Sequence, residues 1–145
     1  MLSNTFANQL YNTLKKHKVY LVYFPLALYW IIIFIATSIP TDAMPQLFKA
    51  QDKLEHFAAY FILEILLALT VHFQSKFPTV KKKPILFSLL FLALYAAVDE
   101  IHQYFIPGRY ADVFDWAADV TGGMMAIFIV LTFLKKTSVI QKSEV

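Results

Sequence analysis

Residues 99–123, DEIHQYFIPGRYADVFDWAADVTGG, join two apolar stretches of this 145-residue chain. The mostly apolar run from Ile85 to Val98 leads directly into the first acidic pair of the segment. A Pro-Gly-Arg turn at 107–109 follows, and the second apolar stretch then continues to Leu134. Five carboxylates lie where the two stretches meet: Asp99, Glu100, Asp112, Asp115 and Asp119. Because carboxylates are costly beside lipid, we expect the protein to use or neutralise them.

The composition is that of a membrane protein. Hydrophobic residues make up 59% of the chain and charged residues 16%, with a mean hydropathy of +0.56, whereas a quarter of the residues of a soluble domain are typically charged. The length suits one domain. The chain has no cysteine, which excludes disulfides, thiolate metal sites and a cysteine nucleophile. No nucleic-acid motif is present, so we expect the lipid bilayer, and no nucleic acid, as a partner.

Four apolar segments are long enough to cross a bilayer as helices. They cover residues 19–36, residues 52–73, a segment that begins at Pro84, and residues 113–134. We therefore predict an all-α, four-helix transmembrane domain over residues 19–136. A cytoplasmic segment, residues 1–18, precedes it and a cytoplasmic tail, residues 137–145, follows it. The first segment is either a short helix on the inner membrane surface or a polar tail.

The positions of the lysines and arginines predict the orientation. Ten of the thirteen lie in residues 1–18, in the loop 74–83 or in the segment after Leu134. Cytoplasmic loops of membrane proteins carry an excess of such residues. The sequence thus predicts both termini in the cytoplasm and the acidic segment 99–123 at the outer face of the cell membrane.

Polar residues recur along the predicted spans at helical spacing, so that each set lies on one side of its helix. The sets are Asp52, His56, Tyr60 and Glu64 on the second span, Asp99, His102 and Gln103 on the third, and Asp112, Asp115 and Asp119 on the fourth. Ionisable side chains in spans generally face protein rather than lipid. We therefore predict one outward-facing pocket formed by Asp52, His56, Asp99, Gln103, Arg109 and Asp115.

Three motifs resemble the VanZ-like family of small bacterial membrane proteins. They are DKLEHFAAY at 52–60, DEIHQYFIPGR at 99–109 and DVFDWAADVTGG at 112–123, and the resemblance covers about residues 30–135. The resemblance implies a four-span fold and a shared polar site. Its residues here are Asp52, Lys53, His56, Phe57, Tyr60, Asp99, Glu100, Gln103, Arg109 and Asp115, with Asp119 where the family commonly has asparagine.

The resemblance also implies a cellular role. The family is named for a member linked to reduced sensitivity to the glycopeptide antibiotic teicoplanin, and most members have no assigned activity. For this chain it implies a bacterial membrane protein linked to the cell envelope or to the glycopeptide-antibiotic response.

Several functions remain compatible with the residues. Lys53 or Arg109 could simply pair with Asp99, Glu100 or Asp115 inside the bundle. A divalent cation could bind among the carboxylates and histidines, although no H-E-x-x-H motif occurs. Such an ion would permit metal-assisted attack on a lipid-linked phosphate, with Arg109 as the phosphate contact.

Net charge favours another function, the binding of a cationic ligand. The outer half carries eight acidic residues and three basic ones, a formal charge of −5 with histidines neutral. Such a negative field attracts an amine-bearing ligand. We therefore expect a non-enzymatic, ligand-binding membrane protein in which Arg109 contacts the ligand. A small proton-linked transporter is a further alternative.

Overall fold

The computed structural model describes residues 2–40, 47–48 and 50–137, and every regular element within them is a helix. A short π-helical turn, η1, leads directly into the second α-helix. The elements are α1 (Leu2–Lys16), η1 (Val19–Tyr23), α2 (Phe24–Thr37), α3 (Gln51–Phe73), α4 (Pro78–Lys82), α5 (Pro84–Gln103) and α6 (Val113–Lys136). Asp42, Lys49 and Lys142, which were included in the charge counts of the sequence analysis, lie outside the described residues.

Four helical segments have the length and hydropathy needed to cross a membrane. They are Val19–Thr37, Gln51–Phe73, Pro84–Gln103 and Val113–Lys136. The prediction of an all-α protein with four spans is confirmed, and the bounds differ from the predicted ones by only one or two residues. Pro84 occupies the first turn of α5, where its missing N–H leaves no hydrogen bond unmade.

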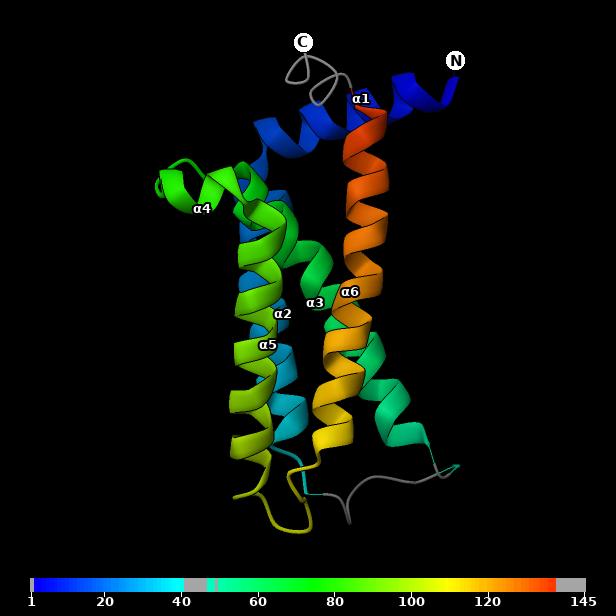
Figure 1. Cartoon of the computed structure of the whole chain (residues 1–145), viewed down its shortest axis with the longest axis vertical. Coiled ribbons are helices and arrows are strands. Elements are labelled where there is room, and N and C mark those ends of the chain that lie inside the picture. The colour runs from blue at the N-terminus through cyan, green and yellow to red at the C-terminus, as the bar shows by residue number, and fades with distance from the viewer. Residues whose placement is uncertain (1, 41–46, 49, 138–145) are drawn as a thin grey trace.

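The long helices pack side by side as a bundle in which α3 crosses α6 (Figure 1). The α3–α6 interface is the most extensive one, and α5 packs against both of these helices. Gly122 of α6 permits the close approach, because a Cβ atom there would overlap the carbonyl oxygen of Phe57 on α3. Small residues commonly allow such backbone approach between membrane helices.

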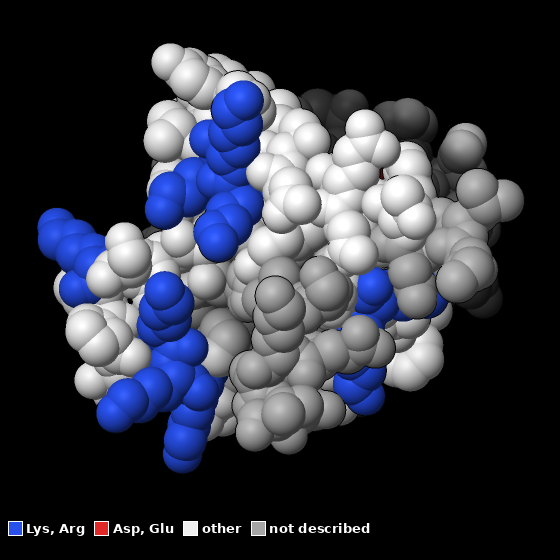
Figure 2. All heavy atoms as spheres, turned by 90° about the horizontal axis from the view of Figure 1, so that it is seen from above, with Lys and Arg blue, Asp and Glu red and all other residues white. Residues whose placement is uncertain are grey.

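One end of the bundle carries α1, α4 and the end of α6, and its charged surface is dominated by lysine (Figure 2). Helix α1 lies across this end, where Tyr11 is buried and its hydroxyl lies 3.2 Å from His72 Nε2. Phe6 and Leu10, on another side of α1, remain exposed. This exposed apolar side suits a helix at a membrane surface. The basic loop also contains α4, a short helix that the sequence analysis missed, with Pro78 in its first turn.

The opposite end holds the connection between α5 and α6 (Figure 1) and the acidic residues. Two apolar clusters separate the two ends. One, near α1, includes Tyr11, Phe73 and Leu134, and the other includes Leu63, Leu67 and Leu92. The acidic end is therefore separated from the lysine-rich end by mainly apolar packing.

Candidate functional site

Lys53, on the first turns of α3, joins three carboxylates. Its Nζ atom lies 2.7 Å from Asp112 Oδ2, 2.7 Å from Asp115 Oδ1 and 3.2 Å from Asp52 Oδ2. Asp115 is buried, whereas the Lys53 and Asp52 side chains are partly exposed. The predicted pairing of Lys53 with Asp115 thus occurs and ties the start of α6 to the start of α3.

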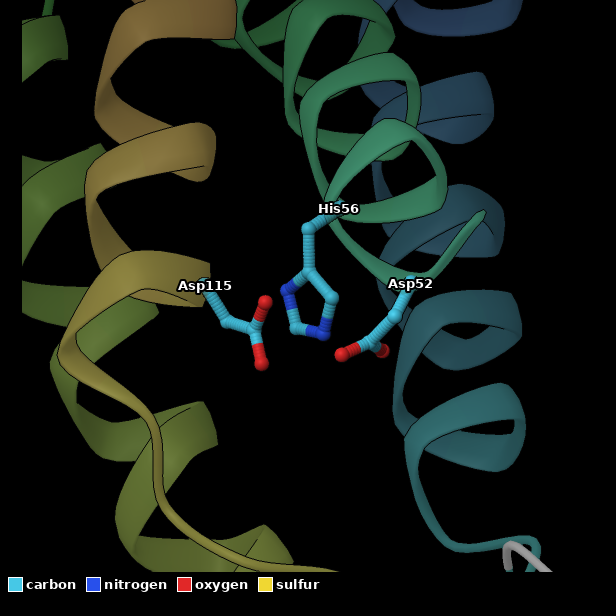
Figure 3. A group of neighbouring side chains, drawn as sticks. All are labelled: Asp52, His56 and Asp115. Atoms are coloured by element: carbon cyan, nitrogen blue, oxygen red, sulfur yellow. The ribbon is translucent and has the colours of Figure 1, made fainter. Parts of the chain in front are cut away.

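His56 lies one turn further along α3, beside the carboxylates of the neighbouring helices. Its Nδ1 atom is 3.0 Å from Asp119 Oδ1 and 3.9 Å from Glu100 Oε1. Figure 3 shows the imidazole ring between the carboxylates of Asp52 and Asp115 as well. His56, Glu100 and Asp119 are all buried. His56 thus lies at the centre of the acidic end. It is on the same side of α3 as Asp52, as their spacing of four residues predicts.

Asp99 forms a second buried polar centre on α5. It accepts hydrogen bonds from Thr37 Oγ1 at 2.9 Å, Tyr60 OH at 3.1 Å and Gln103 Nε2 at 3.3 Å. These donors come from α2, α3 and α5, so Asp99 connects three spans. Several donors around one carboxylate compensate for the cost of burying it.

Arg109 connects the turn after α5 to the end of α2. Its Nε donates to the carbonyl of Ile39 at 2.8 Å, and Nη2 donates to that of Ala36 at 3.1 Å. Its Nη1 donates to Gln103 Oε1 at 2.9 Å. An arginine at a helix C-terminus satisfies free carbonyl groups and interacts well with the helix dipole. Arg109 therefore holds the α2 end in place, a contribution that neither of its predicted roles included.

Asp112 caps α6 and lies outside the membrane-spanning segments. Its Oδ1 accepts the Phe114 N–H at 2.9 Å, and its own N–H donates to Glu100 Oε2 at 2.7 Å. The hydrogen bond from Lys53, followed by that from Phe114, lowers the pKa of the Asp112 carboxyl. An aspartate is among the preferred N-cap residues. The ion pairs of Lys53 thus reinforce a helix start that the local sequence already favours.

A cavity of about 100 Å³ opens beside this network. It is lined by Ile33, Ala36, Thr37, Asp52, Glu55, His56, Ala59, Tyr60 and Arg109. A second hollow of about 280 Å³ adjoins it and shares Asp52 and Arg109. The second hollow also contacts Gln103, Asp112 and Asp115. We refer to the first, smaller cavity as the acidic pocket.

The six residues predicted to form one pocket lie at the same end of the bundle but do not line a single cavity: Asp52, Gln103, Arg109 and Asp115 line the second hollow, and Asp99 lines neither of the two. Asp52, His56, Tyr60 and Arg109 line the acidic pocket itself. Asp99, Glu100, Asp119 and Lys53 support it through direct contacts to these residues or their partners. Whether they bind a ligand remains a prediction.

Two further residues belong to the pocket and its polar network, although the sequence pattern did not predict them there. Thr37 donates to Asp99 and lines the acidic pocket, and Glu55 lines it too. Thr37 lies at the end of an apolar span that has no charged residues at helical spacing, so the sequence pattern did not predict its contact with Asp99. Glu55 was counted only as a charge, because it lies off the Asp52–His56–Tyr60 stripe.

Glu64 lies deeper, one turn beyond Tyr60 on the same stripe, and does not join the network. It is fully buried, and neither carboxylate oxygen has a hydrogen-bond partner among the described residues. Ser88 is its polar neighbour on α5, but the Ser88 hydroxyl donates to the carbonyl of Ile85. Glu64 therefore lies outside the network formed by the other acidic side chains.

The site can offer oxygen and imidazole donors to a cation. Two groups of three side chains bring potential ligand atoms within 4.8 Å of one another: Asp52, His56 and Asp115, and His56, Glu100 and Asp119. Both groups contain His56. Carboxylate and imidazole are common ligands of divalent cations.

These features define a multi-pass integral membrane protein with a buried acidic network at one end of a four-helix bundle. The family model for VanZ/LLP1 matches residues 4–135, so the chain belongs to the VanZ/LLP1 family. No curated protein and no solved structure matches the chain significantly. The family match covers α1 as well as the four spans, more of the chain than the resemblance over residues 30–135.

Proposed function

We propose that this protein binds the cationic group of a cell-envelope ligand in the acidic pocket and acts without catalysing a reaction. The main support for the proposal is an excess of carboxylates over basic side chains at the acidic end, where both neighbouring basic side chains already have hydrogen-bond partners. At this end the described residues include seven acidic side chains, Asp52, Glu55, Asp99, Glu100, Asp112, Asp115 and Asp119. The basic ones are Lys53 and Arg109.

Neither basic side chain neutralises the pocket wall by itself. Lys53 is shared among three carboxylates, and Arg109 donates to Gln103 and to two backbone carbonyls. A concave site with such an excess of one charge concentrates ligands of the opposite charge. An ammonium group is therefore a better occupant than a phosphate.

The lining of the pocket suggests an amphipathic ligand. Asp52 and Glu55 supply charge, while Ile33, Ala36 and Ala59 supply apolar surface from α2 and α3. At about 100 Å³ the cavity suits a single substituted ammonium group rather than an entire antibiotic or lipid. The rest of such a ligand would lie outside the pocket.

The link to the envelope comes from the family. VanZ-like proteins take their name from a teicoplanin-resistance protein, and teicoplanin carries an amine. A bacterial protein of this kind at the outer face of the cell membrane would meet amine-bearing glycopeptides before they reach their targets. Antibiotic response is therefore the cellular context that we propose.

The two alternatives are a metal-assisted hydrolase of a lipid-linked phosphate and a small proton-linked transporter. The described residues at this end carry seven acidic and two basic side chains, so even one bound divalent cation would leave an excess of negative charge that disfavours phosphate. Beneath the network the packing is mainly apolar, with Glu64 and Ser88 among the buried polar exceptions, so few groups are available to relay a proton across the bundle. Both observations favour cation binding.

Ligand binding can be tested with the intact protein in lipid nanodiscs. Teicoplanin and dodecylamine serve as probes, and N-acetylated dodecylamine, which lacks the charge, is the ligand control. We expect Asp52→Asn combined with Glu55→Gln to weaken binding of both probes by roughly tenfold, since hydrogen bonds to charged groups contribute about 1.5–3 kcal/mol. Glu144→Gln, which removes a carboxylate from the carboxyl-terminal tail, is the matched control. Equal binding of the acetylated probe would contradict the proposal.

A further inference from the structure

We infer that His56, Glu100 and Asp119 form a binding site for a divalent transition-metal ion, buried beneath the acidic pocket. The three residues come from α3, α5 and α6, so an ion held by them would join the three helices that pack most closely. The inference does not depend on the proposed amine binding, which involves Asp52 and Glu55 at the pocket wall.

The distances between the donor atoms match those around a metal ion. His56 Nδ1 lies 3.0 Å from Asp119 Oδ1 and 3.9 Å from Glu100 Oε1, and the three ligand atoms fit within 4.8 Å. Metal–ligand bonds of about 2.1 Å in tetrahedral geometry separate neighbouring ligand atoms by roughly 3.4 Å. An ion would replace the hydrogen bond between His56 Nδ1 and Asp119 Oδ1, with the three side chains adjusting around it.

Two carboxylate oxygens of this group make no hydrogen bond within the described part of the chain. Glu100 Oε1 and Asp119 Oδ2 have no hydrogen-bond partner among the described residues. Glu100 is 7% exposed and Asp119 is 0% exposed, so bulk water does not satisfy them. A buried polar atom without a partner is costly and in a folded protein usually has a specific reason. A bound cation would supply that reason.

The other group of possible ligands, Asp52, His56 and Asp115, is the weaker candidate. The ammonium group of Lys53 already lies against two of its carboxylates, those of Asp52 and Asp115. Lys53 forms no ion pair with Glu100 or Asp119. The negative charges of Glu100 and Asp119 are therefore not compensated by Lys53. For this reason we place the ion in the group formed by His56, Glu100 and Asp119.

One imidazole and two carboxylates favour a particular class of metal. Imidazole suits transition metals such as Zn²⁺, whereas purely oxygen sites suit Mg²⁺ and Ca²⁺. Three protein ligands with an open position are typical of zinc sites that exchange water or other ligands. Zn²⁺ and Mn²⁺ are therefore suitable probes, with Ca²⁺ as the comparison.

The site can be tested by equilibrium dialysis of chelator-treated, detergent-purified protein against Zn²⁺, followed by elemental analysis. We expect one Zn²⁺ ion per chain and much weaker binding of Ca²⁺. Glu100→Gln and Asp119→Asn should each weaken Zn²⁺ binding at least tenfold. Asp52→Asn and Glu55→Gln are matched controls and should bind as tightly as the unmodified protein.

Mn²⁺ bound to the unmodified protein provides a test that does not depend on whether variants fold. Pulsed electron paramagnetic resonance should detect coupling of the bound Mn²⁺ to a histidine nitrogen, and His56→Gln should remove it. Three outcomes would overturn the inference: no stoichiometric Zn²⁺ binding, bound Mn²⁺ without nitrogen coupling, or loss of binding in Asp52→Asn but not in Glu100→Gln.

Discussion

Lys53 connects residues that are about sixty positions apart in the chain, and its contacts explain why a partly exposed lysine matters for stability. Asp115 is buried and relies on this ammonium group, whereas Asp52 and Asp112 are partly exposed. Removing one partner of a buried ion pair leaves the other charge uncompensated. Lys53 therefore contributes to the stability of the protein mainly through its ion pair with Asp115, and less through its pairs with Asp52 and Asp112.

We expect Lys53→Met to destabilise the protein by about 1–3 kcal/mol, less than for a fully buried pair because Lys53 is partly exposed to solvent. Thermal unfolding in detergent measures the change. Lys82→Met, which removes an exposed lysine from α4, should leave the unfolding temperature unchanged. An equal effect of the two substitutions would show that total charge, not the contact with Asp115, is responsible.

Asp112 allows the ion pair to be separated from the helix cap. Asparagine caps helices about as well as aspartate, so Asp112→Asn removes the charge and keeps the cap. Because the folded state lowers the pKa of Asp112 below its ordinary value of 3.8, its charge stabilises the protein above that pH. The stabilisation is lost as the pH falls below it.

The wild-type protein should accordingly exceed Asp112→Asn in stability at pH 6, and the difference should shrink as the pH falls below 3.8. Denaturant unfolding of both proteins across this range measures it. In a Lys53→Met background the difference at pH 6 should be smaller, because the main cause of the lowered pKa is gone. A difference that grows on acidification would contradict this interpretation.

Arg109 contributes through geometry as well as charge. The planar guanidinium group reaches the carbonyls of Ile39 and Ala36 and the side chain of Gln103 at once. We expect Arg109→Ala to lower the unfolding temperature and Arg109→Lys to restore only part of it, since an ammonium group lacks the planar fork. A fully stable Arg109→Ala protein that no longer binds amine would instead support a direct ligand contact.

At the level of helices, the α3–α6 interface depends on Gly122, the first of two consecutive glycines of α6. A Cβ atom at Gly122 would overlap the backbone oxygen of Phe57 and lie 3.1 and 3.2 Å from the Phe57 carbonyl carbon and the Phe61 nitrogen. A Cβ atom at Gly123 would instead meet the end of the Leu92 side chain. Backbone atoms of a packed helix yield less easily than a flexible side chain.

The two glycines therefore form a matched pair for mutation. Gly122→Ala should destabilise the protein by about 1–3 kcal/mol, because the two helices must separate. Gly123→Ala should be close to neutral, since alanine gains about 1 kcal/mol of helix propensity and Leu92 can move. Thermal unfolding distinguishes them, and a larger effect of Gly123→Ala would show that the interface is not limited by backbone contact.

At the level of the whole molecule, the two ends of the bundle differ in charge, which is the basis for its predicted orientation. Lysines of α1, α4 and α6 gather at one end (Figure 2), and the acidic network occupies the other. The positive-inside rule then places both termini in the cytoplasm. The side of the membrane on which each end lies remains a prediction.

Reporter fusions test this orientation directly. A fusion at Val80, within α4, should report a cytoplasmic location, and a fusion at Ala111, between α5 and α6, should report an external one. The physical reason is the cost of translocating the lysine-rich loop. An external signal at Val80 would reverse the topology and place the acidic pocket inside the cell.

The four spans, and the helix face on which each polar side chain of a span lies, could be predicted from the sequence because both depend on periodic patterns. Long apolar runs define membrane helices, and spacings of three and four place Asp52, His56 and Tyr60 on one side of α3. Within a single helix, sequence spacing determines the face on which a side chain lies. The sequence alone also determined the family, through motifs that lie on three of the spans.

Which side chains pair with one another was decided only by the tertiary structure. Lys53 and Arg109 were equal candidates for Asp115, yet Lys53 takes it because α3 and α6 approach at Gly122, while Arg109 turns toward the end of α2. The contact between Thr37 and Asp99 joins residues 62 positions apart, which no local spacing encodes. Sequence periodicity specifies the face of each helix, but the rotation and separation of packed helices depend on side-chain volumes along the whole interface.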